Sequence, residues 1–205
     1  MFLGNIALLV AAASLSLTFI VSTLTLVLTR RMLLAASLGS ASMAVFALAL
    51  ALGSEYSSML KPCDNLPLRI LLVSTPSLLL VLLSEYLAAR GGVESTLPLP
   101  TRPLPLLALT LLLFAPLGEE LVFRAFLLIP LTGLLGNLWA LIVSSVVFSL
   151  LHMSTMPKPL LPVIFAVGLV MGASVIAWGS LIPSMVSHSI LNLQGLLTLW
   201  RYRHD

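Results

Sequence analysis

The sequence predicts an all-α, polytopic bundle of about seven transmembrane helices, and composition, run length and polarity pattern all favour it. Of its 205 residues, 60% are hydrophobic and only 8% are charged, with a mean hydropathy of +1.15. Soluble domains carry about 25% charged residues, so a soluble fold is excluded. Apolar runs of about 20 residues recur, long enough for spanning helices. Their polarity does not alternate, which argues against a β-barrel. We expect one transmembrane domain over residues 1–205.

Seven apolar runs are each long enough to span a bilayer. They are Phe2–Leu28, Met32–Leu52, Ile70–Ala89, Leu104–Leu131, Leu134–His152, Leu160–Trp178 and Leu181–Trp200. The first run is too long for a signal-peptide core and follows no basic segment, so we expect a retained helix. Gly179 and Ser180 leave almost no loop between the last two runs, so six helices with a broken or re-entrant last segment is the alternative. The proline-rich stretch 91–105 is expected to be an interfacial linker.

Lys and Arg residues predict the orientation of the bundle. Seven lie on one expected side of the membrane: Arg30, Arg31, Arg90, Arg102, Lys158, Arg201 and Arg203. Only Lys61 and Arg69 lie on the other, so we expect the N-terminus outside and the C-terminus inside. These residues are scattered at the ends of apolar runs, so the net charge of +3 does not indicate nucleic acid. The single cysteine, Cys63, excludes an intramolecular disulfide.

One apolar run contains charges at its centre. Leu104–Leu131 includes Glu119, Glu120 and Arg124, and a single charge in a spanning helix costs roughly 2.5 kcal/mol or far more. Glu120 and Arg124 are four residues apart, so they share a helix face and are expected to pair. Glu119 is rotated by about 100° from Glu120, so it can face a cavity instead. In the alternative, both glutamates pair with Arg124 and only brace the bundle.

Later helices carry further polar residues at helical spacing. His188 and Asn192 are four apart and share a face, and His152 follows Phe148 by four residues. A carboxylate such as Glu119 can act as a general base toward water, and a neighbouring His can orient that water. A His and an Asn can donate to a developing oxyanion. The set therefore favours hydrolysis of an amide bond within the membrane, although either His alone could be an ordinary packing or interfacial residue.

Other catalytic motifs are absent from the sequence. It contains no His-Glu-x-x-His zinc helix, no Gly-x-Ser-x-Gly elbow and no phosphate-binding glycine loop. Two His and a Glu can bind zinc in other hydrolases. Here they lie on separate helices, so the sequence decides neither for nor against a divalent metal. No cofactor is expected and no metal ligand is assigned.

Two features bear on how the polar residues could meet. Pro116 removes a backbone hydrogen bond and is expected to open the helix near Ala115, which would admit water beside Glu119. His152 is expected near the inner membrane boundary, whereas Glu119 and His188 are expected nearer the middle. At 1.5 Å per residue these depths differ by roughly 10 Å, so tilted helices or a longer fifth helix would be needed.

The combination of motifs resembles the CPBP membrane proteases, a family that includes CAAX prenyl endopeptidases and bacteriocin-processing enzymes and is also called Abi. The family motifs are Glu-Glu-x-x-x-Arg, Phe-x-x-x-His and His-x-x-x-Asn or Asp. They are matched, in this order and within residues 118–192, by Glu119, Glu120 and Arg124, by Phe148 and His152, and by His188 and Asn192. Each motif alone is weak, but the three in order on successive apolar segments are specific.

The resemblance implies a role for each matched residue. Glu119 would be the general base that activates water, assisted by His152, while His188 and Asn192 would stabilise the oxyanion. Glu120 and Arg124 would support the site. The implied substrates are prenylated C-terminal tails or peptide leaders, and the implied location is a prokaryotic cell membrane. The resemblance covers no motif in the first three helices, and the oligomeric state is not indicated.

Two other functions fit the same residues. A non-catalytic immunity or scaffold protein could retain the motifs as a structural brace. A proton-coupled transporter could use buried Glu and His as a relay, but the chain is short and lacks two matching halves with broken helices.

Overall fold

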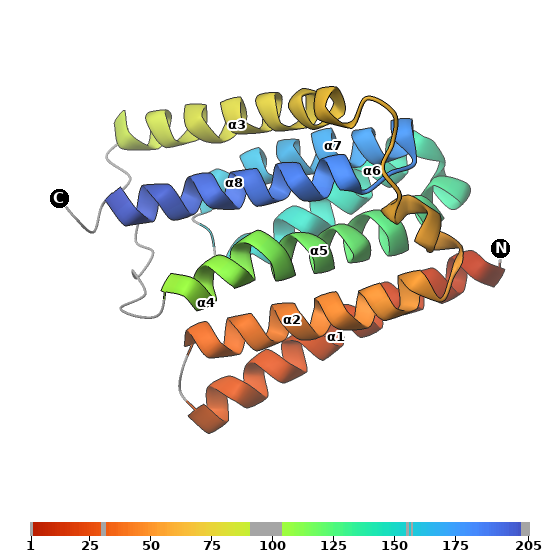
Figure 1. Ribbon diagram of the computed structural model, residues 1–205, viewed down its shortest axis with the longest axis horizontal. Helices are drawn as coiled ribbons and strands as arrows, with labels where there is room; N and C mark the ends of the chain where they lie inside the picture. The colour runs from red at the N-terminus through yellow and green to blue at the C-terminus, as the bar shows by residue number, and fades with distance from the viewer. Residues whose placement is uncertain (1, 30–31, 91–103, 155, 157, 202–205) are drawn as a thin grey trace.

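The structure is a computed structural model that describes residues 2–29, 32–90, 104–154, 156 and 158–201. Over these residues the regular secondary structure is entirely helical. Helical segments run side by side along the long axis of the molecule, and the marked chain ends lie at opposite ends of it (Figure 1). The predicted all-α, polytopic bundle is confirmed.

The helices follow the apolar runs closely. The first three are α1 (Phe2–Thr29), α2 (Met32–Leu52) and α3 (Leu66–Arg90), with a short 3₁₀ helix, η1 (Glu55–Leu60), before α3. A long helical stretch then comprises α4 (Leu104–Leu109), η2 (Thr110–Phe114), α5 (Ala115–Glu120), η3 (Leu121–Leu128) and α6 (Ile129–Leu151). Short 3₁₀ turns, η4 (His152–Ser154) and η5 (Lys158–Leu160), precede α7 (Leu161–Trp178) and α8 (Ile182–Arg201). The predicted linker at 91–105 lies almost wholly outside the described residues.

Gly136 divides the long stretch into two arms. Its φ of 75° and ψ of 164° are not helical, and glycine adopts a positive φ without steric penalty. The second arm folds back on the first, and two contacts join them. Ser144 Oγ donates to the Phe123 carbonyl at 3.0 Å, and the Phe123 and Phe148 rings meet edge to face at 5.2 Å. The two predicted helices are therefore present, with the break at Gly136 rather than just before Leu134.

The last two apolar runs form separate helices. Gly179 ends α7 with a left-handed φ of 63°, and α8 begins three residues later. This turn is tied to the segment between η1 and α3, because Ser180 Oγ donates to the Lys61 carbonyl and the Leu181 amide donates to the Met59 carbonyl, both at 2.8 Å. Counting the two arms separately, the described part of the chain has seven long helical segments rather than six, and the second arm is the shortest of them.

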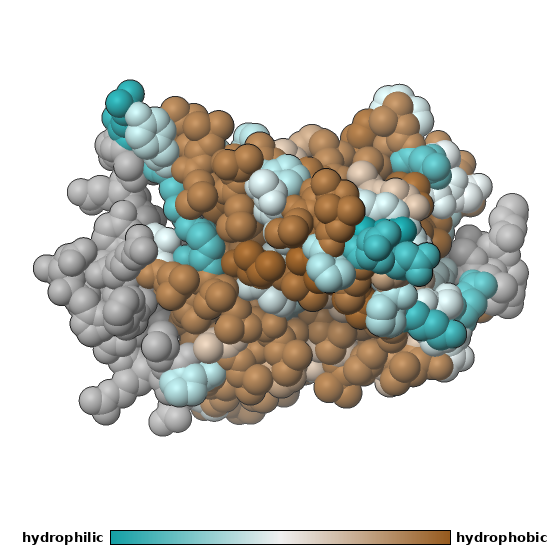
Figure 2. Space-filling view, turned by 45° about the horizontal axis from the view of Figure 1, so that its top comes forward, coloured by the Kyte–Doolittle hydropathy of each residue, from teal (hydrophilic) through white to brown (hydrophobic). Residues whose placement is uncertain are grey.

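Five stretches are long and apolar enough to cross a membrane, among the residues that the structure describes. One of them, Pro105–Leu151, is 47 residues long and contains the Gly136 break. The others are in α1, α2, α3 and α7, whereas α8 is more polar. Large hydrophobic side chains are exposed along these helices, including Phe19 and Leu28. Figure 2 shows hydrophobic residues over most of the middle of one face, with hydrophilic ones mainly toward its ends, as an integral membrane protein requires.

Small residues allow the helices to approach closely. Ala7, Ala11, Ala47 and Ala51 are buried between α1 and α2 and belong to the main hydrophobic core. That core also contains the apolar residues of η3 with Phe148 of α6. Small interfacial residues are typical of helix packing in membranes.

Glu85 and Arg90, near the C-terminal end of α3, make different contacts. Arg90 lies over the Tyr86 ring at 4.8 Å. The Glu85 carboxylate instead accepts hydrogen bonds from Gln194 Nε2 at 3.0 and 2.9 Å, because α8 lies beside α3 and brings its amide within reach. This contact joins α3 to α8.

Candidate active site

The part of the first arm from Leu104 to Leu128, which comprises α4, η2, α5 and η3, is here named the site helix. Its central α5 is flanked by two stretches of π-helix, η2 and η3, and the Ala115 amide donates to the Thr110 carbonyl five residues back. Pro116 follows directly and has no amide hydrogen to donate. The sequence predicted an opening near Ala115, and the structure shows it as a change of helical register. Such π segments are rare and frequently lie at functional sites.

Gly118 brings the site helix against α2. A Cβ atom at Gly118 would lie 3.0 Å from the Ala44 backbone nitrogen and from Met43 Cε. Only a residue without a side chain allows this approach. The two glutamates that follow therefore start from a backbone that is fixed on one side by α2.

Glu120 is fully buried and is held by two cationic or potentially cationic groups. Arg124 Nε donates to Glu120 Oε2 at 3.2 Å, and both side chains have no exposed surface. His188 Nδ1 lies 3.1 Å from Glu120 Oε1. The predicted pairing of Glu120 with Arg124 is confirmed, and the contact with His188 ties the site helix to α8.

Glu119 faces in another direction, as its rotation on the helix predicts. Its side chain is 19% exposed, and Oε2 lies 3.8 Å from His152 Nε2 and 3.8 Å from His188 Nε2. Both separations are too long for hydrogen bonds. Glu119 Oε2 is buried and has no hydrogen-bond partner among the described residues. The expected gathering of Glu119, His152 and His188 from three helical segments is therefore present.

The far side of each imidazole is fixed by an acceptor. His152 Nδ1 lies 2.8 Å from the Phe148 carbonyl oxygen, which can only accept, so this nitrogen carries a hydrogen. His188 Nδ1 likewise donates to the carboxylate of Glu120. Both Nε2 atoms are thus directed toward Glu119 Oε2, and the other ring nitrogen sets the ring orientation.

Phe148 lies at the centre of this group. Its ring centroid is 4.7 Å from that of His152 and 6.1 Å from that of His188. The Arg124 guanidinium carbon lies 4.9 Å from the same ring, on its face, where a cation is attracted by the ring quadrupole. Phe148 is 3% exposed, so it covers the site on one side with apolar surface.

Asn192 makes a contact that the motif spacing does not predict. Its Nδ2 donates to the Leu111 carbonyl of η2 at 2.7 Å. Ser189, one residue after His188, donates to the next carbonyl, that of Leu112, at 3.0 Å. Sequence reasoning missed Ser189 because no motif contains it, and the only signal for it was its place on the same helix face as Asn192.

The depth difference expected for His152 is not observed. The second arm runs only from Asn137 to Leu151, about 22 Å at 1.5 Å per residue, less than the ~30 Å hydrocarbon core. The break at Gly136 folds this arm back, and His152 Nε2 lies 3.8 Å from Glu119 Oε2.

Metal binding is not indicated by the present geometry. No group of three or more His, Cys, Asp or Glu side chains has the arrangement of a metal site within the described ranges. Tetrahedral zinc with ligands at 2.0–2.1 Å requires ligand atoms about 3.4 Å apart. Glu119 Oε2 and the two Nε2 atoms, at 3.8 Å, would have to move several tenths of an ångström closer.

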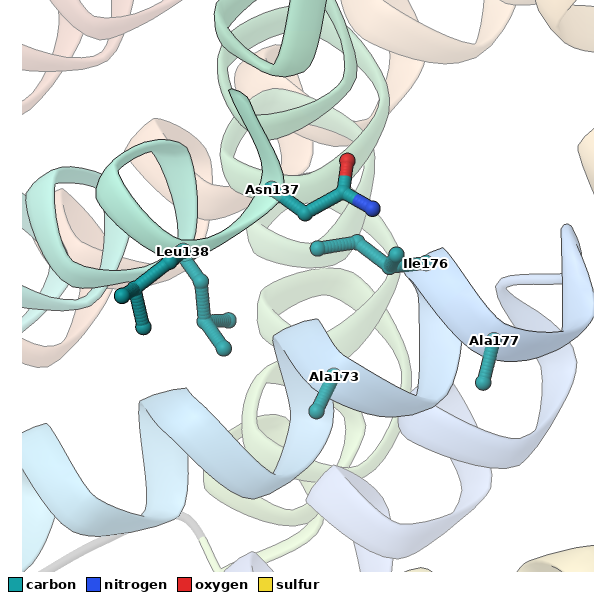
Figure 3. Close-up of a pocket in the computed structure, with 6 residues that line it drawn as sticks. Asn137, Leu138, Ala173, Ile176 and Ala177 are labelled. Carbon is teal, nitrogen blue, oxygen red and sulfur yellow. The ribbon is translucent and has the colours of Figure 1, made fainter. Parts of the chain in front are cut away.

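A shallow hollow of about 310 Å³ lies elsewhere, between α6 and α7 (Figure 3). It is lined by Asn137, Leu138, Leu141, Ala173, Ile176 and Ala177. No predicted site residue lines it, and its lining is almost wholly apolar, so we assign it no part in the chemistry.

Comparison with known proteins agrees with this geometry. Residues 101–194 match the model of a family described as type II CAAX prenyl endopeptidase Rce1-like. The matched region contains all seven predicted site residues and excludes the first three helices. No curated protein and no solved structure shows a significant match. Residues 101–194 of this membrane protein are thus similar to the Rce1-like type II CAAX prenyl endopeptidase family, which is consistent with a CPBP protease.

Proposed function

We propose that the chain is an intramembrane endopeptidase, CAAX-protease-like, that hydrolyses a peptide bond with water activated by Glu119. The observation that carries the proposal is the position of Glu119 Oε2, 3.8 Å from both imidazole Nε2 atoms. Polar atoms at this separation are suited to share a bridging water. A water molecule there would have one general base and two imidazoles within hydrogen-bond reach.

Glu119 takes a proton from the water, and the resulting hydroxide forms a bond to the carbonyl carbon of the substrate peptide. His152 Nε2 accepts a hydrogen bond from the second hydrogen of the water, which stays on the hydroxide, because Nδ1 of this ring already donates to Phe148. Collapse of the tetrahedral intermediate breaks the C–N bond. Glu119 then returns the proton to the leaving amine, so that one water is added across one amide bond.

His188 stabilises the oxyanion in its protonated form. Nδ1–H donates to Glu120, and Nε2–H, on the Glu119 side, donates to the developing negative charge. The buried Glu120 carboxylate holds this charged imidazole in place and is itself balanced by Arg124. Glu120, Arg124 and Phe148 therefore act as supports and do not touch the substrate.

The substrate is a prenylated C-terminal protein tail or a peptide leader, presented within the bilayer of a prokaryotic cell membrane. The family match supports the first class. Because the site lies among apolar helices, a substrate with its own lipid or apolar segment reaches it more readily than a soluble peptide. No nucleic acid takes part.

The test uses the full chain in liposomes, with a prenylated CAAX peptide and the same peptide without its prenyl group. Glu119→Gln keeps the size of the side chain but removes the base, so cleavage should fall by about 10²- to 10⁴-fold. Glu85→Gln is the matched control, because Glu85 contacts Gln194 between α3 and α8. It should cleave like the unaltered chain. Product is measured by mass spectrometry.

Three outcomes would contradict the proposal. Full activity of Glu119→Gln would remove the assigned base. Loss of cleavage on adding a chelator, with recovery on adding zinc, would show that the attacking water is bound to a metal ion and is not activated by Glu119 alone. Absence of any product from the unaltered, folded chain would favour the non-catalytic immunity or scaffold function.

A further inference from the structure

We propose that Asn192 and Ser189 are positioning residues, which donate hydrogen bonds to two carbonyls of the site helix just before Pro116 and thereby hold the site helix in register with α8. The reaction that they serve is the one proposed above. The contact between the two helices itself does not depend on that reaction, so it can be tested separately.

The Leu111 carbonyl lacks a backbone donor because of the local register. In an α-helix its partner would be the Ala115 amide, but that amide donates to Thr110. In the π register its partner would be residue 116, which is proline and has no amide hydrogen. Asn192 Nδ2 donates to this carbonyl at 2.7 Å. The side chain from α8 thus supplies the hydrogen bond that the site helix cannot make itself.

Ser189 contacts the next carbonyl. In an α-helix the partner of Leu112 would be Pro116, which has no amide hydrogen, and in the π register it would be the Leu117 amide. Ser189 Oγ lies 3.0 Å from the Leu112 oxygen. The same hydroxyl lies 3.0 Å from the Met185 carbonyl of its own helix, so its one hydrogen is shared. Its contribution is therefore expected to be smaller than that of Asn192.

These two contacts lie beside the catalytic group. Ser189 directly follows His188, and Asn192 is one turn further along α8. Leu111 and Leu112 lie about two turns before Glu119 on the site helix. Apolar packing alone allows two helices to slide along each other, whereas two directed hydrogen bonds fix their relative position. Fixing that register sets the 3.8 Å distance from Glu119 to His188.

In this proposal Asn192 holds the Leu111 carbonyl of the site helix, whereas the family resemblance implies that it stabilises the oxyanion. Removing a residue that contacts the reacting peptide slows the reaction without loosening the helix. Removing a positioning residue loosens the helix whether or not substrate is present. Backbone hydrogen exchange over Thr110–Glu120 distinguishes the two, because it reports helix opening in the free protein.

The first experiment compares Asn192→Ala with Gln194→Ala in the full chain. Gln194 is the matched control, since it is an amide on the same helix but donates to Glu85 of α3. Asn192→Ala should speed exchange over Thr110–Glu120 by about tenfold, as for loss of the partner of a buried carbonyl. Gln194→Ala should leave that segment unchanged. Ser189→Ala should show a smaller increase, against Ser174→Ala, a buried serine whose hydroxyl donates within α7.

The second experiment restores the missing donor from the other side. Pro116→Ala returns an amide hydrogen that can reach the Leu111 or Leu112 carbonyl. Combined with Asn192→Ala, it should return exchange and peptide cleavage to within about threefold of Pro116→Ala alone. It should not rescue any defect of Gln194→Ala. If Pro116→Ala is itself inactive, the exchange comparison decides.

Two results would overturn the proposal. Unchanged exchange in Asn192→Ala, with cleavage lost, would place Asn192 on the substrate. Restored exchange without restored cleavage in the double variant would do the same. Because exchange needs no substrate, a chain that cleaves nothing would refute the proposed function and leave this test intact.

Discussion

Glu119 and Glu120 are adjacent in the chain, but their side chains are 19% and 0% exposed. One helical step of about 100° separates them. It directs Glu120 to Arg124 and His188 and leaves Glu119 beside the two Nε2 atoms. The two identical side chains therefore have different surroundings. A substitution of Glu120 should lower the stability of the protein, whereas a substitution of Glu119 should lower its cleavage activity.

Glu120→Gln is expected to unfold the protein more easily. The change leaves the fully buried Arg124 without its compensating charge, and breaking a buried ion pair in this way costs about 3–5 kcal/mol. Thermal unfolding in detergent should show a clear drop in Tm. Glu119→Gln is the control and should retain the Tm of the unaltered chain while losing cleavage. A Glu120→Gln protein with unchanged Tm would show that the pair does not stabilise the fold.

For individual residues, the sequence predicted which side chains lie close together in the site. It predicted only some of the hydrogen-bond partners of those side chains. Helical spacing was sufficient for the Glu120–Arg124 pair, because both partners lie on one helix. The contact of Asn192 with Leu111 depends on a backbone carbonyl of another segment. Such a carbonyl has no signature in the side-chain pattern, so the spacing of motifs could not indicate it. The assignment of catalytic roles stays a prediction.

Among the elements, the two arms around Gly136 decide the position of His152. Sequence reasoning expected His152 and Glu119 to differ in depth by roughly 10 Å. The 3.8 Å distance between their side chains contradicts that expectation. The break falls at Gly136 and the second arm is short. The register changes in η2 and η3 were also not predicted, because Pro116 indicates a disturbed helix but not the form that the disturbance takes.

Gly136→Ala is expected to destabilise the hairpin between the arms. Alanine at a φ of 75° and a ψ of 164° carries a backbone penalty of about 1–3 kcal/mol, although open space surrounds the position. Gly133→Ala is the matched control, since that glycine also has nothing within 4 Å and no positive φ. It should be neutral or slightly stabilising. Equal Tm values for the two variants would mean that backbone conformation at Gly136 is not what fixes the turn.

For the whole molecule, the pattern of charges and the arrangement of helices lead to one proposed orientation. An odd number of spanning segments would place the termini on opposite faces of the membrane, and α1 begins and α8 ends at opposite ends of the bundle (Figure 1). The excess of Lys and Arg then favours a C-terminus inside. The helical class followed from composition alone, because few charges and long apolar runs admit few other folds. That residues 1–205 form one domain stays a prediction.

Cys63 provides a direct test of this orientation. It is the only cysteine of the chain, is partly exposed, and lies between η1 and α3. With the N-terminus outside, a membrane-impermeant maleimide should label Cys63 in intact cells. Cys63→Ser is the control for background. Labelling only after the membrane is opened would reverse the orientation.

The polarity of α8 has a consequence for biosynthesis. This last helix carries His188 and Asn192, yet it is not among the stretches apolar enough to cross a membrane, as far as the structure describes the chain. A segment of this kind gains little from lipid and must be received by helices already inserted. His188 contacts Glu120 and lies 3.8 Å from Glu119. These contacts therefore form only after the site helix has been inserted and α8 has packed against it.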